Sequence, residues 1–163
     1  MPELEITVVP NQPLVTMTRE LDAPLELVVR AHLEPDLVAQ WWGPRGVEIV
    51  VERYEARDGG RWRIVHHDAD GEFAFYGVFH GTPSAGGIVQ TFQYEGAPPL
   101  LQVLTFEERK SRTIVRTTAA YLSVEARDAM VEAGMASGAE EGYDRLDELL
   151  GRLGGPSLKT RHD

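Results

Sequence analysis

The residue with the clearest chemical potential is His66, which falls in a segment of alternating apolar and polar side chains at 61–67. Because successive strand residues point to opposite faces, Trp62, Ile64 and His66 share one face. If that face is internal, His66 places a titratable ring inside an apolar site; a hydrogen-bonded core histidine is the alternative. His67 must point the other way, so the adjacent pair cannot chelate one metal ion from a regular strand.

Other motifs for metal binding or catalysis are incomplete. Asp68, Asp70 and Gly71 resemble the start of a calcium loop, but the distal ligands at the required spacing are missing and a hairpin turn explains them better. No serine lies in a Gly-x-Ser-x-Gly motif, and the sequence has no phosphate-binding glycine loop. The chain also contains no cysteine. We therefore expect no catalytic residue, no metal and no cofactor.

Aromatic and glycine residues indicate a different chemistry, the binding of an apolar molecule. Aromatic side chains recur on the expected strands, and such groups line most ligand pockets, although they also build ordinary cores. Gly134, Gly138 and Gly142 recur every fourth residue of an expected helix, where each costs about 1 kcal/mol relative to alanine. They fit either close packing of the helix on the sheet or space left for a ligand. The residues that we predict to line such a site are Trp62, His66, Phe75, Phe92, Met135, Gly138, Gly142 and Tyr143, with Trp41 and Trp42 near its entrance.

The composition limits the partners. With 26 Asp and Glu against 16 Lys and Arg, the 163-residue chain carries a formal net charge of −10. Such a chain repels phosphate backbones and anionic lipid, so we expect neither a nucleic-acid nor a membrane partner, while a homodimer fits the sequence. The sequence shows no transmembrane window and no signal peptide, and the lack of cysteine suits a reducing cytoplasm, where we place the protein.

The elements that must position these residues form one domain. We expect an extended N-terminal arm at 1–13, the domain at 14–153 and a polar tail at 154–163. Period-two and period-3.6 patterns distinguish strands from helices within the domain. The expected order is a strand at 14–21, short helices at about 22–32 and 37–40, strands at about 47–56, 61–67, 72–81, 87–95, 100–108 and 112–121, and one long helix at 123–153.

The connections between the last six strands determine the architecture. They are short and rich in glycine, aspartate and proline, and short connections force neighbouring strands to be antiparallel. Seven strands must bury one face, and the C-terminal helix is the large apolar partner that the sequence offers. We therefore predict an α+β domain in which a curved antiparallel seven-stranded sheet wraps around a long C-terminal helix, with two short helices after strand 1.

Four segments resemble the successive signatures of one protein family. They are Arg19–Pro24, Trp41–Pro44, Arg57–Arg63 and Glu141–Tyr143, in that order. Together they resemble the bacterial single-domain proteins that are similar to the activator of the heat-shock protein 90 ATPase. That group belongs to the START-like, or SRPBCC, superfamily with the helix-grip fold. The resemblance covers about residues 14–153; family members commonly have Gly-Trp where this chain has Gly142-Tyr143, which keeps a large amphipathic ring.

The resemblance implies a hydrophobic small molecule held between the sheet and the C-terminal helix, which agrees with the aromatic and glycine pattern. Two alternatives come with it. One is a protein-interaction module that activates a chaperone ATPase; the other is a cyclase- or hydrolase-like enzyme using the same cavity, with His66 or a strand carboxylate as general acid or base. The Asn- and Trp-rich chaperone-contacting domain of the eukaryotic activator has no counterpart in this sequence. We therefore expect the small molecule, and not a chaperone, as the partner.

Overall fold

The computed structural model describes residues 3–154, so nearly all of the expected polar tail lies outside the described residues. Within them, the strands and helices follow one another in the order that the sequence predicts, with two differences given below. The elements are β1 (Glu5–Val8), β2 (Leu14–Leu21), α1 (Leu25–Leu33), α2 (Pro35–Trp41), β3 (Glu48–Tyr54), β4 (Arg61–Asp68), β5 (Gly71–Val78), β6 (Ile88–Tyr94), β7 (Leu100–Arg109), β8 (Arg112–Ala120), α3 (Val124–Glu132) and α4 (Met135–Leu153).

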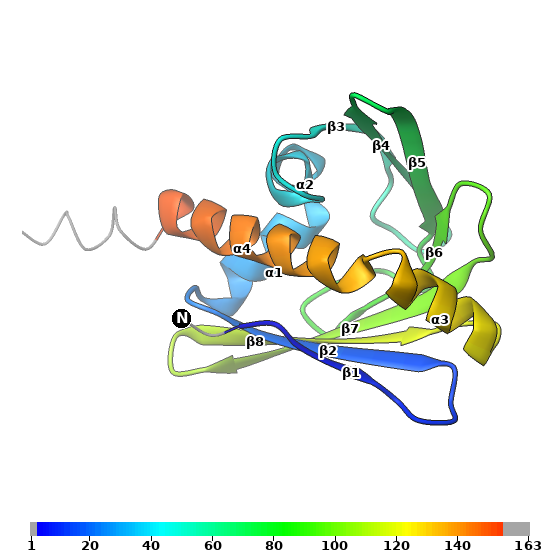
Figure 1. Cartoon of the computed structure of the whole chain (residues 1–163). Helices are drawn as coiled ribbons and strands as arrows, with labels where there is room; N and C mark the ends of the chain where they lie inside the picture. The colour runs from blue at the N-terminus through cyan, green and yellow to red at the C-terminus, as the bar shows by residue number, and fades with distance from the viewer. Residues whose placement is uncertain (1–2, 155–163) are drawn as a thin grey trace, which may run out of the picture.

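The strands form one antiparallel eight-stranded sheet in the order β1-β2-β8-β7-β6-β5-β4-β3. β2 and β8 pair along their whole length, from Leu14 opposite Ala120 to Leu21 opposite Thr113. This pairing brings the first long strand beside the last, so the start and the end of the domain share one part of the sheet. Figure 1 shows the sheet curving around α4, which lies along its concave side.

The sheet turns sharply between β5 and β6. Only two residue pairs join these strands directly, Phe75 with Tyr94 and Tyr76 with Gln93, before an isolated bridge joins Phe79 to Gln90. In Figure 1, β4 and β5 rise away from the plane that contains β2, β7 and β8. The turn divides the sheet into two parts, β1-β2-β8-β7-β6 and β5-β4-β3.

The expected strand count of seven is one too low, because residues 5–8 of the predicted arm form β1. This short strand pairs with β2, with Glu5 opposite Thr18 and Val8 opposite Val15. Four residues are too few for an alternation pattern to stand out in the sequence. The pairing is decided by the free edge of β2, which β1 covers.

The expected single helix at 123–153 is two helices in the structure. Ser123 caps α3 as its sequence suggests, because its hydroxyl accepts a hydrogen bond from the Ala126 amide at 3.0 Å. Gly134 then adopts a left-handed conformation with φ of 92°, which ends the first helix and begins α4. A side chain is strained in this conformation, so glycine is the favoured residue there.

The core lies between α4 and the sheet. Leu146, Leu149 and Leu150 of α4 are buried completely or nearly so, and they join the same hydrophobic cluster as Val15 and Val115 of the sheet. Burying a leucine side chain contributes about 1.5–3 kcal/mol, so this C-terminal half of α4 anchors the helix. No helix among residues 3–154 is long and apolar enough to cross a membrane.

Candidate functional site

A cavity of about 570 Å³ lies between the concave face of the sheet, α4 and the segment that joins α2 to β3. Strands from both halves of the sheet contribute to it, and so do both helices of the C-terminal pair. Most of its lining side chains are aliphatic or aromatic. Small-molecule sites in proteins typically measure roughly 300–1,000 Å³ and have this kind of lining.

The structure brings nine of the ten predicted site residues together around the cavity. They are Trp41, Trp42, His66, Phe75, Phe92, Met135, Gly138, Gly142 and Tyr143. They come from α2, the segment after it, three strands and α4, so the cavity depends on elements from the whole length of the domain.

Trp62 is the tenth predicted residue, and it does not line the cavity. It is 3% exposed, and its indole Nε1 donates a hydrogen bond to the Thr91 carbonyl at 3.2 Å. This bond crosses Gly77, where a Cβ atom would lie 1.8 Å from the Thr91 oxygen and 2.7 Å from the indole nitrogen. Trp62 therefore ties β4 to β6 at the turn of the sheet, and glycine at position 77 makes room for that bond.

An aromatic wall, formed by Trp42, Phe73, Phe75, Phe92 and Tyr94, lines one side of the cavity. The ring of Phe75 is central, with centroids 5.0 Å from Trp42, 5.1 Å from Tyr94 and 5.7 Å from Phe92. All five residues are only partly buried. The faces of aromatic rings are apolar, which makes the wall suited to contact with an apolar molecule.

The two adjacent tryptophans have different environments. Trp41 is 8% exposed, donates its indole hydrogen to the Ala31 carbonyl at 2.9 Å and stacks on Tyr143 at 5.9 Å. Trp42 stands at the end of α2 and contributes its ring to the aromatic wall. Trp41 thus fastens α2 to the core, while Trp42 offers the more accessible surface to the cavity.

The three helix glycines serve three different purposes. Gly134 provides the left-handed junction between α3 and α4. Gly138 lines the cavity, and no atom outside its own helix backbone and chain neighbours lies within 4 Å of where its Cβ would be. Gly142 meets the backbone of Trp41 and Gly43 at 3.7 Å, which is an ordinary packing distance. Open space therefore lies beside Gly138, whereas Gly142 packs against the backbone at the end of α2.

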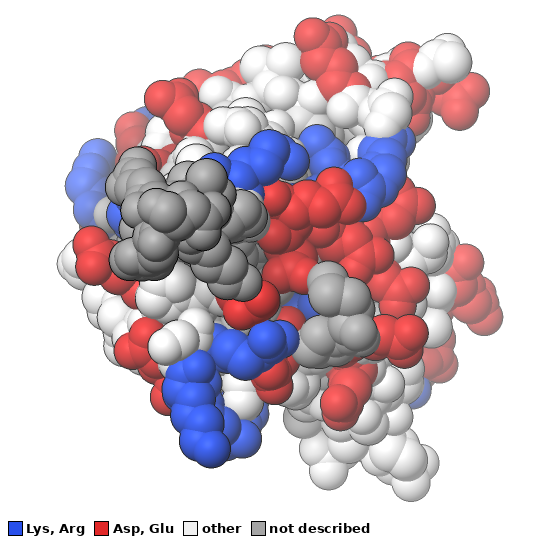
Figure 2. Space-filling model, turned by 90° about the vertical axis from the view of Figure 1, so that its left-hand side faces the viewer, with Lys and Arg blue, Asp and Glu red and all other residues white. Residues whose placement is uncertain are grey.

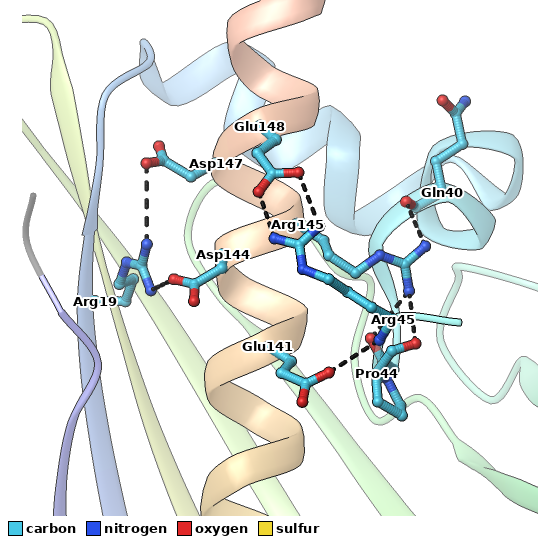
Figure 3. A network of polar contacts seen from close by, with 10 residues as sticks. Arg19, Gln40, Pro44, Arg45, Glu141, Asp144, Arg145, Asp147 and Glu148 are labelled. Carbon is cyan, nitrogen blue, oxygen red and sulfur yellow. Dashed lines mark hydrogen bonds and ion pairs between the residues drawn. The ribbon is translucent and has the colours of Figure 1, made fainter. Parts of the chain in front are cut away.

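Arg145 of α4 holds the α2–β3 segment in place over the cavity (Figure 3). Its guanidinium donates to the carbonyls of Gln40 and Gly43, both at 3.0 Å, and of Pro44 at 3.2 Å and Trp42 at 3.3 Å. The Gln40 carbonyl belongs to the last turn of α2, where carbonyls lack partners within the helix. One side chain therefore fixes the turn that carries Trp42 and so positions one end of the aromatic wall.

A second arginine fastens the same segment from the other direction. The backbone amide of Arg45 donates to Glu141 at 2.9 Å, and the Arg45 guanidinium pairs with Glu148. Figure 3 shows both arginines on the side of α4 that faces α2. The opposite side of the helix carries Asp144, which pairs with Arg19 of β2.

Two glutamines form a hydrogen-bonded polar pair in the cavity, and neither was predicted from the sequence as a site residue. Gln90 of β6 and Gln102 of β7 stand opposite each other, and Gln90 Nε2 donates to Gln102 Oε1 at 2.8 Å. Both line the cavity. The alternation of Ile88, Gln90 and Phe92 in the sequence is the signal that would have found Gln90, because it places a polar residue on an otherwise apolar inward face.

The histidines at the cavity favour the neutral state. Burial lowers the pKa of His32 to about 4, although a hydrogen bond between its Nδ1 and the Val28 carbonyl, 2.8 Å long, opposes that shift. Burial also lowers the pKa of His66. The Nε2 atoms of both rings are buried and have no hydrogen-bond partner. His32 was not predicted as a site residue, because its position on a short helix gives no indication of the cavity.

Three of the strand carboxylates that the enzyme alternative could use face away from the cavity. Glu48, Glu52 and Glu72 are exposed, Glu52 pairs with Arg63 at 2.9 Å, and none of the three lines the cavity. Asp68, at the β4–β5 hairpin, is the carboxylate among the described lining residues. Among residues 3–154, no group of three or more histidine, aspartate and glutamate side chains is arranged to hold a metal ion.

Comparison with solved structures identifies the fold. A protein from Rhodobacter sphaeroides has 24% sequence identity and a TM-score of 0.86, over 93% of this chain and 100% of that one. A protein from Mycobacterium smegmatis has 22% identity and a TM-score of 0.83, over 90% and 95% of the two chains. A protein from Arthrobacter aurescens has 20% identity and a TM-score of 0.83, over 91% of each. At these identities the likeness shows a shared fold.

Comparison with sequence families identifies the group. No curated protein matches the sequence significantly. The profile of the family described as "Activator of Hsp90 ATPase homolog 1-like protein" matches residues 22–151, which span α1 to α4. The helix-grip architecture, with its sheet curved around α4, is the one that the sequence signatures imply. The chain therefore belongs to the family of activator of Hsp90 ATPase homolog 1-like proteins.

Proposed function

We propose that this protein binds a small, largely hydrophobic molecule in the cavity between the concave sheet and α4. The observation that carries the proposal is the open space beside Gly138, on the side of α4 that faces the sheet. Protein interiors are close-packed, and an unfilled apolar cavity costs stability in proportion to its volume. An apolar ligand in a cavity of about 570 Å³ would supply the missing contacts.

The aromatic wall supports the same function. Its rings are held from behind by the turn of the sheet and from one end by Arg145, so the surface is formed before a ligand arrives. Preorganisation of this kind lowers the entropy cost of binding. Most of the described lining residues are aromatic or aliphatic, which suits binding through apolar contact, and a few imidazole, hydroxyl, amide and carboxylate groups lie among them.

A direct test uses N-phenyl-1-naphthylamine, a neutral apolar fluorophore. We expect saturable binding with micromolar affinity, accompanied by quenching of tryptophan emission, because Trp42 belongs to the cavity wall. Gly138→Leu should fill the space beside α4 and abolish binding. Ser137→Leu is the matched control, since it adds the same side chain at the adjacent, exposed position and should leave binding unchanged.

Native mass spectrometry of gently purified protein gives a second readout, a retained small molecule that Gly138→Leu should lack. Failure of a varied set of apolar probes to bind, with no retained molecule, would contradict the proposal. Equal binding by Gly138→Leu and the wild type would place any binding site elsewhere on the molecule.

The family description supports a second candidate, stimulation of an Hsp90-type ATPase through the protein surface. The two functions differ in their dependence on the cavity. If the surface carries the activity, Gly138→Leu should stimulate ATP turnover by a bacterial chaperone homologue as well as the wild type does. We expect neither protein to change that turnover, and a saturable several-fold stimulation would support the second candidate.

A further inference from the structure

The amide pair formed by Gln90 and Gln102 presents a hydrogen-bond donor and an acceptor side by side in the cavity. Gln90 Nε2 donates to Gln102 Oε1, which leaves Gln90 Oε1 and the Gln102 Nε2 hydrogens without a protein partner. Neither of these two free atoms is fully buried, so both are in contact with open space. If both amides were turned over, the pair would still offer one carbonyl and one NH₂ group.

The surroundings of this amide pair are apolar. Leu104 and Ile88 stand opposite each other two residues along the same two strands, and Leu100 and Phe92 do so two residues away on the other side. All four line the cavity. A polar group left unpaired among such residues costs free energy, and a ligand group that both donates and accepts would satisfy both glutamines at once.

The charge of the cavity excludes one large class of hydrophobic ligands, those with an anionic head group. No lysine or arginine is found among the lining residues that the structure describes, and both lining histidines have lowered pKa values. The buried Arg19 of β2 lies outside the cavity lining and is already paired with Asp144. Figure 2 shows acidic side chains gathered on the face at which α4 ends, and the formal net charge of −10 for the whole chain also disfavours the approach of an anion.

We propose that the ligand is a neutral, largely aromatic molecule with a group that both donates and accepts hydrogen bonds, such as an amide, lactam or phenol, held by Gln90 and Gln102. This inference rests on the proposed function, because it assumes that the cavity holds a ligand. It adds the chemical class of that ligand and the two residues that select it. The aromatic wall contacts the ring system of the ligand, and the amide pair forms hydrogen bonds with its polar group.

The test compares three naphthalenes that share one ring system: 2-naphthamide, ionised 2-naphthoate and 2-methylnaphthalene. Two hydrogen bonds of ordinary strength correspond to roughly tenfold in affinity. We expect 2-naphthamide to bind about tenfold more tightly than 2-methylnaphthalene, and 2-naphthoate to bind more weakly than either. Tighter binding of the carboxylate, or equal binding of the amide and the methyl compound, would overturn the inference and leave the proposed function standing.

The variant Gln90→Leu/Gln102→Leu tests the residues. It should lower the affinity for 2-naphthamide to that for 2-methylnaphthalene, while the affinity for 2-methylnaphthalene stays the same or rises. Gln93→Leu is the matched control, because Gln93 lies on β6, is absent from the cavity lining and bonds to the Ala97 carbonyl. A preference for the amide that survives the double substitution would overturn the assignment. If none of the three compounds binds the wild type, the proposed function fails as well.

Discussion

Arg19 of β2 and Asp144 of α4 form an ion pair of 2.9 Å although 125 residues separate them in the chain. The arginine is 2% exposed, and Asp147, one helical turn along α4, supports it at 3.9 Å. Figure 3 shows the two aspartates on the side of the helix that faces β2. A buried guanidinium needs such partners, so the pair fixes which face of α4 meets the sheet.

The Arg19–Asp144 pair should show a measurable coupling in a double-mutant cycle. Asp144 is half-exposed, so we expect the interaction to stabilise the fold by about 1.5 kcal/mol, near the lower end for charged hydrogen bonds. Chemical unfolding of Arg19→Ala, Asp144→Ala and the double variant measures it. The exposed Arg30–Glu34 pair of α1, analysed in the same way, should give a much smaller coupling. Equal couplings would show that burial of Arg19 adds nothing.

Alanine substitutions should distinguish the roles of the helix glycines. Gly138→Ala gains helix propensity and meets no clash, so it should raise the free energy of unfolding by about 1 kcal/mol. Gly134→Ala forces a Cβ into a left-handed conformation and should lower it by about 1–2 kcal/mol. Denaturant melts of the two variants test this pair of opposite signs. A loss of stability in Gly138→Ala would show that the space beside α4 is filled in solution by the protein itself.

His32 should make the stability depend on pH. Its pKa is about 4 in the folded state against 6.5 in the unfolded chain, so between these values the unfolded chain binds a proton that the folded protein excludes. Stability should therefore be complete above about pH 6.5 and fall as the pH drops towards 4, by up to roughly 3 kcal/mol from this residue.

The His32 effect is measured by comparing unfolding free energies of the wild type and His32→Asn across that pH range. The asparagine can still donate to the Val28 carbonyl, so the variant should fold while losing the histidine's share of the slope. His80→Asn, at an exposed position, is the control and should keep the wild-type slope. Identical slopes for all three proteins would contradict the assigned burial of His32.

Arg145→Ala should loosen the wall of the cavity without unfolding the domain. It removes the bonds to the carbonyls of Gln40, Trp42, Gly43 and Pro44, so amide hydrogen exchange in the α2–β3 segment should become faster. Binding of N-phenyl-1-naphthylamine should weaken several-fold, because the ring of Trp42 is no longer fixed. Arg152→Ala, at an exposed site near the end of α4, should change neither measurement. An unchanged rate of amide hydrogen exchange in Arg145→Ala would contradict the conclusion that Arg145 holds the α2–β3 segment in place.

The sequence by itself determined the class of fold and the order of the elements, except for β1 and the break between α3 and α4. The alternation at 14–21 corresponds to β2, and that at 61–67 to β4, because a half-buried strand must alternate whatever its partner is. The apolar positions of α4, such as Leu146 and Leu149, follow the helical period for the same reason. The helix-grip fold could also be named from four short signatures, because the chain keeps them in their family order.

The tertiary structure decided the site itself. Helical spacing cannot report a backbone angle, so Gly134, Gly138 and Gly142 looked alike in sequence and differ in what surrounds them. Alternation placed Trp62 on the inner face of its strand but could not show that its indole bonds to Thr91.

The amide pair and the ion pair between β2 and α4 likewise join residues on different elements. A local sequence pattern indicates only whether a side chain faces the interior, because burial against any apolar surface produces the same periodicity. Whether that interior is packed or hollow depends on where the surfaces of the sheet, α2 and α4 end up, and those distances arise only when the whole chain has folded.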